Sequence, residues 1–259
     1  MPYQEIERVF CTNIIRTPGL MALENLASIK LPEQMDKIGD SAFSGCTLLQ
    51  EVSYPKQVGE MGKYVFFNCD GLADENGFVV VNGILYTYCG NAEIIIVPDT
   101  VRRIEDKAFE SKIVEMTCMG EMRQVRKVQR IILPSSVNYT GDFTFAGCVA
   151  EDIVSYGIPV SDFPTPELKL KAFIGYAREY ESFDLFPDIV EINSDYIGRY
   201  KKNYLPYIYE NDFVEGLKII AGTGKTDLKE FNEVYLIPAQ TANAMQCTAF
   251  LIEWRHRQE

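Results

Sequence analysis

The chain has 259 residues, of which 47% are hydrophobic and 24% charged, so it can bury a substantial core as one elongated repeat domain or as two ordinary domains. Its formal net charge of −12 argues against nucleic acids and anionic membranes as partners, because phosphate contacts come from clusters of Lys and Arg. The absence of any run of 18 uncharged apolar residues argues against membrane insertion, and seven cysteines without a Cys-x-x-Cys pair predict reduced thiols.

The first residues predict an intracellular protein. Residues 1–8 lack the basic start and the apolar stretch of a secretory signal. We therefore expect a cytoplasmic chain, the alternative being a cell-surface or secreted protein whose export signal has been removed. Residues 1–20 are expected to form an irregular N-terminal cap over the repeats described next, because an uncovered repeat end would expose its core.

A repeat with a period of 23 residues follows. The first copy holds Pro32, Gly39, Phe43, Cys46 and Leu49, and the second holds Pro55, Gly62, Phe66, Cys69 and Leu72. Two further copies contain Pro98, Ile104, Ala108 and Phe109, and then Pro134, Gly141, Phe145, Gly147 and Cys148. A fixed period of this length is typical of a solenoid, in which stacked units share one core. The sequence therefore predicts four repeats.

Each repeat is expected to begin with a short strand that ends at the proline. The residues three and one before the proline are bulky, as in Ile29 and Leu31 or Ile131 and Leu133. Alternation of this kind is typical of a strand with one buried face. A turn begins seven residues after the proline and leads to a segment with an inward-facing Phe.

These residues resemble the BspA-type leucine-rich repeat, and residues 26–49 follow that pattern almost position by position. The resemblance covers residues 20 to 156. The third copy departs from the pattern, because Glu105 replaces the glycine and no Gly-Cys pair follows Phe109. The segment from Gly77 to Gly90 resembles the extra hairpin that such proteins insert. The resemblance implies a solenoid over residues 21–160, with a hairpin insertion at about 76–92, that serves as a binding or surface-presentation scaffold.

Residues 161–259 are expected to form a helical C-terminal domain of about five helices, which makes the fold class α+β. Apolar residues recur there at spacings of three and four. Pro166 and Pro187 are expected to open helices, Gly222 to close a third, and Thr226 and Asp227 to cap the next. A last helix is predicted from Pro238 to Trp254. The ending, residues 246–254, resembles the helical tail of many intracellular leucine-rich-repeat proteins of gut Firmicutes.

The outward side of the predicted strands is the candidate interaction face. Its residues are Lys30, Ser53, Ile94, Ile96, Arg130 and Ile132. The first two repeats are polar at these positions, whereas the last two carry three isoleucines, which require a cover. Either the C-terminal helices fold back on the isoleucines, which terminal capping favours, or the isoleucines form a docking patch for another chain.

The segment Ala221-Gly-Thr-Gly-Lys-Thr226 ends like a phosphate-binding P-loop. Such a loop needs a glycine five residues before the Gly-Lys pair and a preceding buried strand, whereas this chain has Ile219 there and a predicted helix before it. The segment is therefore interpreted as a helix end followed by a helix start.

Neither the cysteines nor the histidine predict a catalytic or metal site. Cys46, Cys69 and Cys148 share one repeat position, so their spacing follows from the repeat and they are expected to be small buried side chains. His256 is the single histidine of the sequence and lies near the chain end. Serine and cysteine nucleophiles usually depend on a histidine base, and zinc hydrolases need two or more histidines. We predict no catalytic, cofactor-binding or metal-binding residues.

The resulting hypothesis is a non-enzymatic scaffold that binds a protein or peptide on the outward strand face. The alternative is an adhesin-like leucine-rich-repeat protein of the cell surface. The third hypothesis is an enzyme or a nucleotide-binding regulator that uses Gly222 to Thr226, and Ile219 argues against it. The identity of the partner and the oligomeric state are left open.

Overall fold

The computed structural model of the chain describes residues 6–9, 14–15, 25–55, 57–109, 114–116, 122–124, 128–141, 143–146 and 150–258. The chain divides into a repeat unit, Met1–Glu151, and a helical unit, Asp152–Glu259. Most of the expected N-terminal cap, together with Cys11, Cys118, Gly147 and Cys148, lies outside the described residues.

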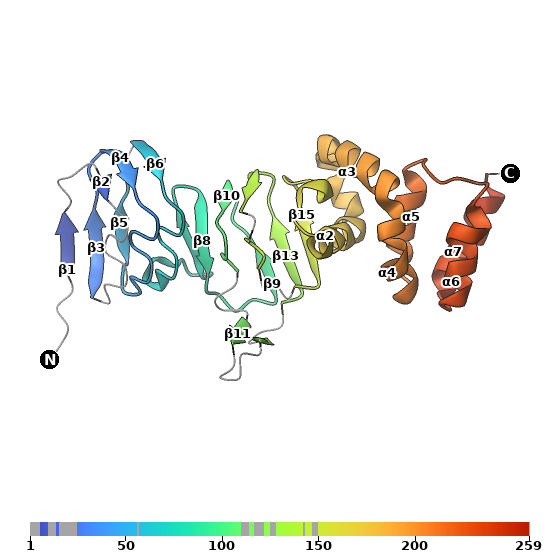
Figure 1. The fold of residues 1–259 in the computed structure, drawn as a ribbon, viewed down its shortest axis with the longest axis horizontal. Coiled ribbons are helices and arrows are strands. Elements are labelled where there is room, and N and C mark those ends of the chain that lie inside the picture. Colours follow the sequence, from blue (N-terminus) through green and yellow to red (C-terminus); the bar gives the residue numbers. More distant parts are fainter. Residues whose placement is uncertain are drawn as a thin grey trace. The chain divides into compact units, whose positions relative to one another are not determined.

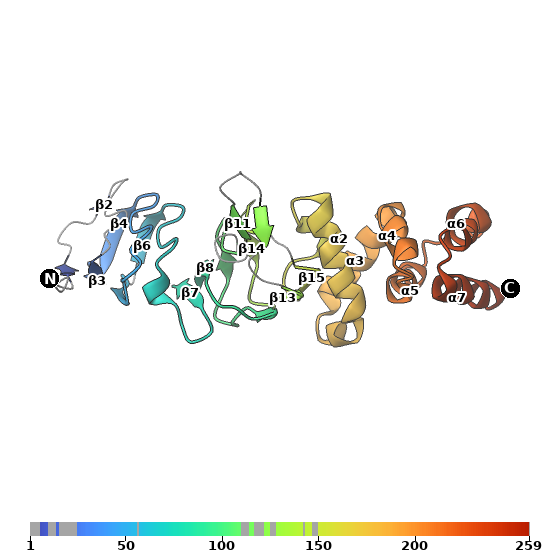
Figure 2. The ribbon, with the colours of Figure 1, turned by 90° about the horizontal axis from the view of Figure 1, so that it is seen from below.

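The repeat unit begins with two parallel ladders, because each repeat contributes two strands. The first ladder joins β1 (Ile6–Val9), β3 (Leu26–Lys30) and β5 (Glu51–Ser53). The second joins β2 (Ile14–Ile15), β4 (Gln34–Ile38) and β6 (Gln57–Met61). Figure 1 shows β1, β3 and β5 side by side, and Figure 2 shows the second ladder beside the first. The second strand was not predicted, because it is more polar and its buried residues, Met35 and Ile38 in β4, lie three positions apart instead of two.

A hairpin then interrupts both ladders. It consists of β7 (Phe78–Val81) and β8 (Ile84–Tyr88), which pair antiparallel. Asn82 and Gly83 form its turn with φ of 50° and 74°, the left-handed region that two-residue hairpins require. β8 also pairs in parallel with β10 (Arg103–Ile104), which pairs with β14 (Tyr139–Thr140). The hairpin therefore replaces one regular turn of the solenoid.

The remaining strands of the repeat unit form two pairs. β9 (Ile94–Ile96) and β13 (Arg130–Leu133) are parallel partners, with Ile94 beside Arg130 and Ile96 beside Ile132. β11 (Val114–Met116) and β12 (Met122–Gln124) form a second, antiparallel hairpin that the sequence did not predict. This insertion separates the third and fourth copies of the repeat.

Stacked aromatic rings fill the repeat core. Phe43 and Phe66 are fully buried and stack with ring centroids 5.2 Å apart, and Phe66 meets Tyr86 edge-on at 5.4 Å. Beyond the hairpin, Phe109 and Phe145 stack in the same way at 5.7 Å. The inward Phe predicted for each repeat is confirmed, and such stacking contributes more than apolar burial alone.

The glycine of the repeat is required by close backbone approach. A Cβ on Gly62 would lie 2.4 Å from the amide nitrogen of Asp40 in the preceding repeat. The carboxylate of Asp40 accepts a hydrogen bond of 2.8 Å from the N–H of Lys63, which fastens one repeat to the next. In the third copy the neighbour is β8 and Glu105 stands in place of the glycine; its buried carboxylate pairs with Arg103 Nε at 2.9 Å.

The helical unit starts with the strand β15 (Asp152–Ser155) and the 3₁₀ turn η2 (Val160–Asp162). The helices that follow are α2 (Pro166–Arg178), η3 (Tyr180–Leu185), α3 (Pro187–Tyr200), η4 (Lys201–Asn203), α4 (Leu205–Glu210), α5 (Val214–Gly222), η5 (Asn232–Leu236), α6 (Ile237–Thr241) and α7 (Met245–His256). None of the described helices combines the length with the apolar character needed to cross a bilayer.

α2 packs directly on β15. Gly175 lies so close that a Cβ there would be 2.2 Å from the carbonyl oxygen of Ile153. Asp152 is 1% exposed and accepts a hydrogen bond of 2.6 Å from Arg178 Nη1 at the end of the same helix. A buried carboxylate without such a partner would be costly, so this ion pair fixes the helix against the strand.

The predicted helix boundaries are partly correct. Pro166 and Pro187 begin α2 and α3, and Gly222 ends α5. The single last helix was wrong, because Asn243 adopts a φ of 56° and separates α6 from α7. The predicted cap at Thr226 and Asp227 was also wrong, since Asp227 instead accepts from the N–H of Lys229 within a loop and the next helix begins later.

Candidate interaction face

Strand alternation places the predicted face residues as expected. The inward residues of β3 and β9 are buried, namely Ile29, Leu31, Ile95 and Val97. Lys30, which lies between Ile29 and Leu31, is exposed, and so is Ser53, its partner on β5. Ile94 and Ile96 are 47% and 63% exposed. Arg130 and Ile132 on β13 are half-buried.

The structure divides the six residues into two groups. Lys30 lies beside Ser53 in the ladder of β3 and β5. The other four, Ile94, Ile96, Arg130 and Ile132, form a block on β9 and β13. Since β5 and β9 belong to different sheets, the face is not one continuous surface of hydrogen-bonded strands. Sequence analysis did not predict this break. The effect of the hairpin insertion on strand pairing depends on the tertiary structure.

A groove lies beside β9. Asn76, Phe78, Tyr88, Ala92 and Pro98 line it together with the three residues of β9, and it encloses about 410 Å³. The rings of Phe78 and Tyr88 are packed with centroids 4.9 Å apart, and the Tyr88 hydroxyl accepts a hydrogen bond of 3.0 Å from the N–H of Ala92. This groove was not predicted; its volume is within the range of ligand-binding clefts.

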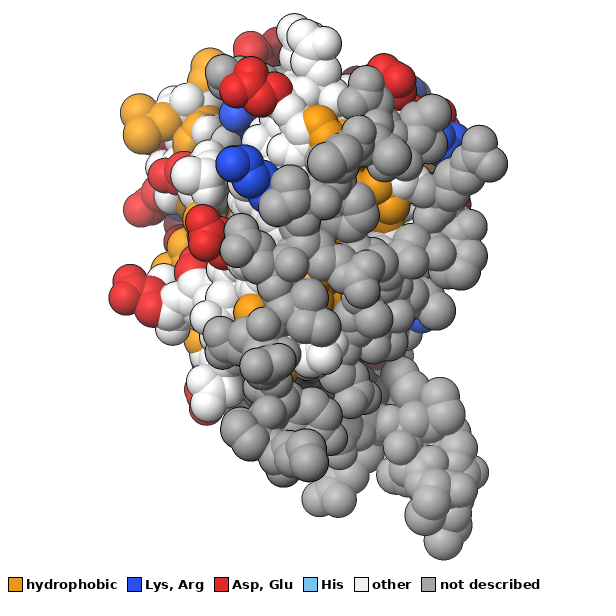
Figure 3. All heavy atoms as spheres, turned by 90° about the vertical axis from the view of Figure 1, so that its left-hand side faces the viewer, with side chains coloured by type: hydrophobic (Ala, Val, Ile, Leu, Met, Phe, Trp, Pro, Cys, Tyr) orange, Lys and Arg blue, Asp and Glu red, His pale blue; other side chains and the backbone are white. Residues whose placement is uncertain are grey.

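The sequence around the groove is acidic. Residues 64–101 contain five carboxylates, Asp70, Asp74, Glu75, Glu93 and Asp99, and no Lys or Arg. Asp74, Glu75, Glu93 and Asp99 are exposed. Elsewhere on the molecule, the face drawn in Figure 3 also carries carboxylates at several places among its described residues. The field around the groove therefore favours positively charged partners.

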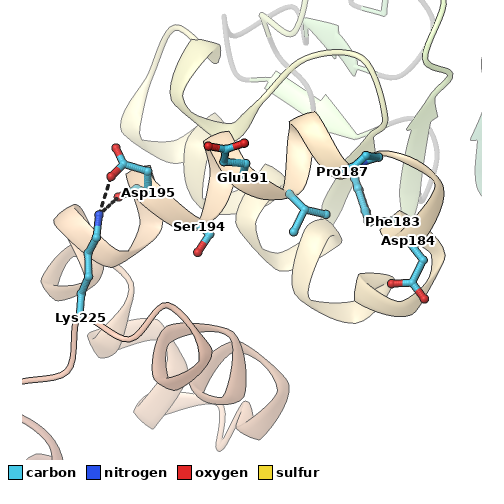
Figure 4. A pocket seen from close by; sticks show the side chains of 8 residues that line it. Phe183, Asp184, Pro187, Glu191, Ser194, Asp195 and Lys225 are labelled. Atoms are coloured by element: carbon cyan, nitrogen blue, oxygen red, sulfur yellow. Dashed lines mark hydrogen bonds and ion pairs between the residues drawn. The ribbon is translucent and has the colours of Figure 1, made fainter.

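A second cavity lies in the helical unit, along α3. It encloses about 520 Å³ and is lined by Phe183, Asp184, Pro187, Val190, Glu191, Ser194, Asp195 and Lys225. Figure 4 shows Lys225 at one end of this cavity, reaching Asp195 of α3. Lys225 Nζ lies 2.5 Å from Asp195 Oδ1 and 3.1 Å from the carbonyl oxygen of Asp195.

The P-loop-like segment is consequently a connector between helices. α5 precedes it, Gly224 turns with a φ of 67°, and Lys225 is held by Asp195. Residues 225–230 are not helical, so the loop does not lead straight into a helix N-terminus as a phosphate cradle does. The geometry supports the interpretation made from Ile219.

We expect Lys225→Met to raise the pKa of Asp195. The hydrogen bond from Lys225 holds that pKa below its usual value, with a further contribution from Arg199. The stabilising effect of the pair is present above the ordinary aspartate pKa and is lost as the pH falls through the lowered value. Carboxyl ¹³C NMR titration measures the change, with Lys229→Met as the control in the same loop. An unchanged Asp195 titration in Lys225→Met would contradict the pairing.

The described cysteines have the environment of buried core groups. Cys69 and Cys247 are free and fully buried, and Cys46 is fully buried as well. The thiol of Cys69 donates to the carbonyl oxygen of Phe43 at 3.0 Å, and burial raises its pKa to about 12. Burial, together with Asp212, raises the pKa of Cys247 to about 12 as well. No cluster of metal-ligating side chains occurs within the described part of the chain.

We expect Cys69 and Cys247 to resist iodoacetamide in the folded protein at pH 8. With pKa values of about 12, only about one thiol in ten thousand is ionised, and the thiolate is the reactive form. Cys89 is partly exposed and should react earlier. Mass spectrometry of tryptic peptides measures each site, and labelling in guanidinium chloride supplies the control. Equal native labelling of Cys69 and Cys89 would show that the core is open.

Two parallel ladders around an aromatic core, with an outward face of mixed chemistry, define a repeat-based interaction fold. The sequence model described as the BspA type leucine rich repeat region matches residues 14–114 and 80–161 in six copies, which covers more than half of the chain. The chain belongs to the BspA-type leucine-rich-repeat family. The predicted number of four copies was too low.

Three solved structures are similar to parts of the chain. A leucine-rich cell surface protein from Faecalibacterium prausnitzii is 23% identical over 61% of this chain, with a TM-score of 0.31. The pneumococcal vaccine antigen PcpA is 18% identical over 52%, with a TM-score of 0.29. The Treponema pallidum (T. pallidum) leucine-rich-repeat protein is 16% identical over 63% of this chain and 79% of its own, with a TM-score of 0.27. The chain spans 34% of the first protein and 40% of the second. None of the curated proteins matches the chain.

Proposed function

We propose that this chain is a non-enzymatic scaffold that binds a protein or peptide through the outward face of β9 and β13. The observation that carries the proposal is the exposure of Ile94 and Ile96 at positions where β3 and β5 present Ser28, Lys30, Glu51 and Ser53. Burying an exposed isoleucine fully contributes about 1.5–3 kcal/mol. A partner that covers these side chains would therefore gain affinity from the contact.

The chain itself supplies an alternative cover for the face. If the helical unit covers the isoleucines in solution, the face is a contact within the protein and a partner binds elsewhere. Hydrogen exchange on the full chain, beside a chain that ends at Phe163, separates the two cases. Unchanged protection of β9 and β13 after truncation supports the docking face, whereas loss of protection there overturns it.

The direct test is affinity capture from the source cells with the full chain as bait. Ile96→Asp combined with Ile132→Asp places charge on the face. The amount of partner captured by this bait, measured by quantitative mass spectrometry, should fall at least tenfold. Ile237→Asp is a matched control, because Ile237 is 53% exposed in the helical unit. Capture that is equal for all three baits would contradict the proposed face.

We place the protein in the cytoplasm, with the cell surface as the alternative. The free, buried thiols of Cys69 and Cys247 support the cytoplasm, since reduced thiols are usual there. Fractionation of the source cells with an antibody against the helical unit tests the location, and recovery in the surface fraction would favour the alternative.

The sole histidine, His256, is exposed at the last turn of α7, which supports a role without histidine-dependent catalysis.

A further inference from the structure

Among the strands that the structure describes, β9 is an edge strand with unpaired backbone groups. It is the last strand of its sheet and pairs through β13 alone. Glu93 O accepts from Arg130 N at 3.3 Å, and Val97 N donates to Ile132 O at 2.9 Å. Alternate residues of a parallel strand bond to the same neighbour, so the backbone of Ile94 and Ile96 faces the other way.

No described residue pairs with those groups. Neither the N–H nor the C=O of Ile94 or Ile96 has a hydrogen-bond partner among the residues that the structure describes. Folded proteins usually blunt an open edge with proline, lysine or a covering segment, because it is a template for another strand. Here the edge consists of three isoleucines, a residue type with a strong preference for strands.

The groove described above borders this edge. Phe78 and Tyr88 are 5% and 1% exposed and form part of its apolar lining, while Ile94 and Ile96 supply the strand. A chain segment that paired with β9 would therefore place alternate side chains toward the groove and toward the exposed isoleucines. Strand addition requires open main-chain hydrogen-bonding groups and a pocket for alternate side chains, and both are present at this edge.

The surrounding charge indicates which segment fits. Glu93 immediately precedes β9 and Asp99 follows it closely, and Asp74 and Glu75 adjoin the groove residue Asn76. Arg130, on β13 beside Ile94, is the basic residue of the neighbouring strand. A second copy of this edge would bring carboxylates against carboxylates, which disfavours self-pairing. A segment with basic flanks would complement them.

We propose that β9 binds its partner by strand addition, and that the partner segment is an extended run of β-branched residues flanked by Lys or Arg. This inference rests on the proposed function and specifies its chemistry. Main-chain hydrogen bonds to Ile94 and Ile96 supply affinity, and the groove and the acidic rim supply selectivity.

The test uses the full chain and a fluorescein-labelled peptide, Lys-Lys-Val-Ile-Val-Thr-Val-Lys-Lys, followed by fluorescence anisotropy. Ile96→Pro removes an edge N–H and leaves the ladder to β13, because proline is tolerated where the N–H faces outward. We expect this variant to weaken binding about fivefold or more, as the loss of one hydrogen bond implies. Ile96→Val keeps both the N–H and the branched side chain and should bind like the wild type.

Two measurements do not depend on the folding of a variant. The same peptide with all five central amides N-methylated can pair through neither of its edges and should not bind, and a version with Glu flanks should bind more weakly. Hydrogen exchange by NMR should show protection of the Ile94 and Ile96 amides when the unmodified peptide is bound, with that of Ile95 unchanged.

The outcomes are distinguishable. Absence of wild-type binding at millimolar peptide, or equal binding of the N-methylated peptide, overturns strand addition. If strand addition is overturned but the Ile96→Asp, Ile132→Asp bait still captures less partner, the proposed docking face is supported and strand addition is not. If that bait also behaves like the wild type, both proposals fail. A dimer in light scattering that Ile96→Pro abolishes would instead assign the edge to a second copy of the chain and overturn the proposed partner segment.

Discussion

Phe66→Ala should destabilise the repeat unit by about 3–5 kcal/mol, the usual cost of removing a large ring from a packed core. Phe66 is fully buried between Phe43 and Tyr86, so its loss breaks the line of rings that connects the regular repeats to the hairpin. Neighbouring side chains from two different repeats would have to collapse into the space. The expected decrease in the melting temperature is roughly 6–20 °C. Urea unfolding followed by circular dichroism measures the free energy.

Phe143→Ala is the matched control. Phe143 is 60% exposed, and its backbone N–H, which donates to Asp106 Oδ1 at 2.9 Å, is retained in the variant. An exposed substitution of this kind should change stability by no more than about 0.5 kcal/mol. Similar losses for both variants would mean that the rings do not form a continuous core.

Gly175→Ala should destabilise the helical unit by about 3 kcal/mol, at the upper end of the range for overpacking. Helix propensity alone predicts the opposite, since alanine is about 1 kcal/mol better than glycine inside a helix. The new Cβ would lie 2.2 Å from the Ile153 carbonyl oxygen and 2.5 Å from its carbon. These are backbone atoms of β15, so α2 must move away from the strand and the Asp152–Arg178 pair must stretch.

Gly222→Ala is the matched control, because this glycine has free space around it. Gly222 is the last residue of α5, and a Cβ added there would meet no atom within 4 Å. We expect unchanged or slightly higher stability, measured by thermal unfolding beside Gly175→Ala. If Gly175→Ala were as stable as the wild type, the close approach of α2 to β15 would be wrong.

The candidate interaction face could be predicted residue by residue but not as a surface. The two-residue alternation before each proline correctly indicated that Lys30, Ser53, Ile94 and Ile96 point away from the core. It could not show that β5 and β9 belong to separate sheets, nor that a groove lies beside the open edge. Those features depend on how the hairpin of β7 and β8 takes the place of a regular turn.

Sequence analysis alone predicted the repeat, the buried phenylalanines, the strand-ending prolines and several helix starts, because each depends on local periodicity or on the backbone restrictions of one residue. Tertiary structure decided which strands pair, where the ladder is interrupted, and why Gly62 and Gly175 admit no side chain. Pairing and close approach join residues distant in the chain, so no local pattern encodes them. The same reason applies to the edge of β9: its isoleucines are visible in the sequence, whereas the lack of a second partner among the described strands is visible only in the fold.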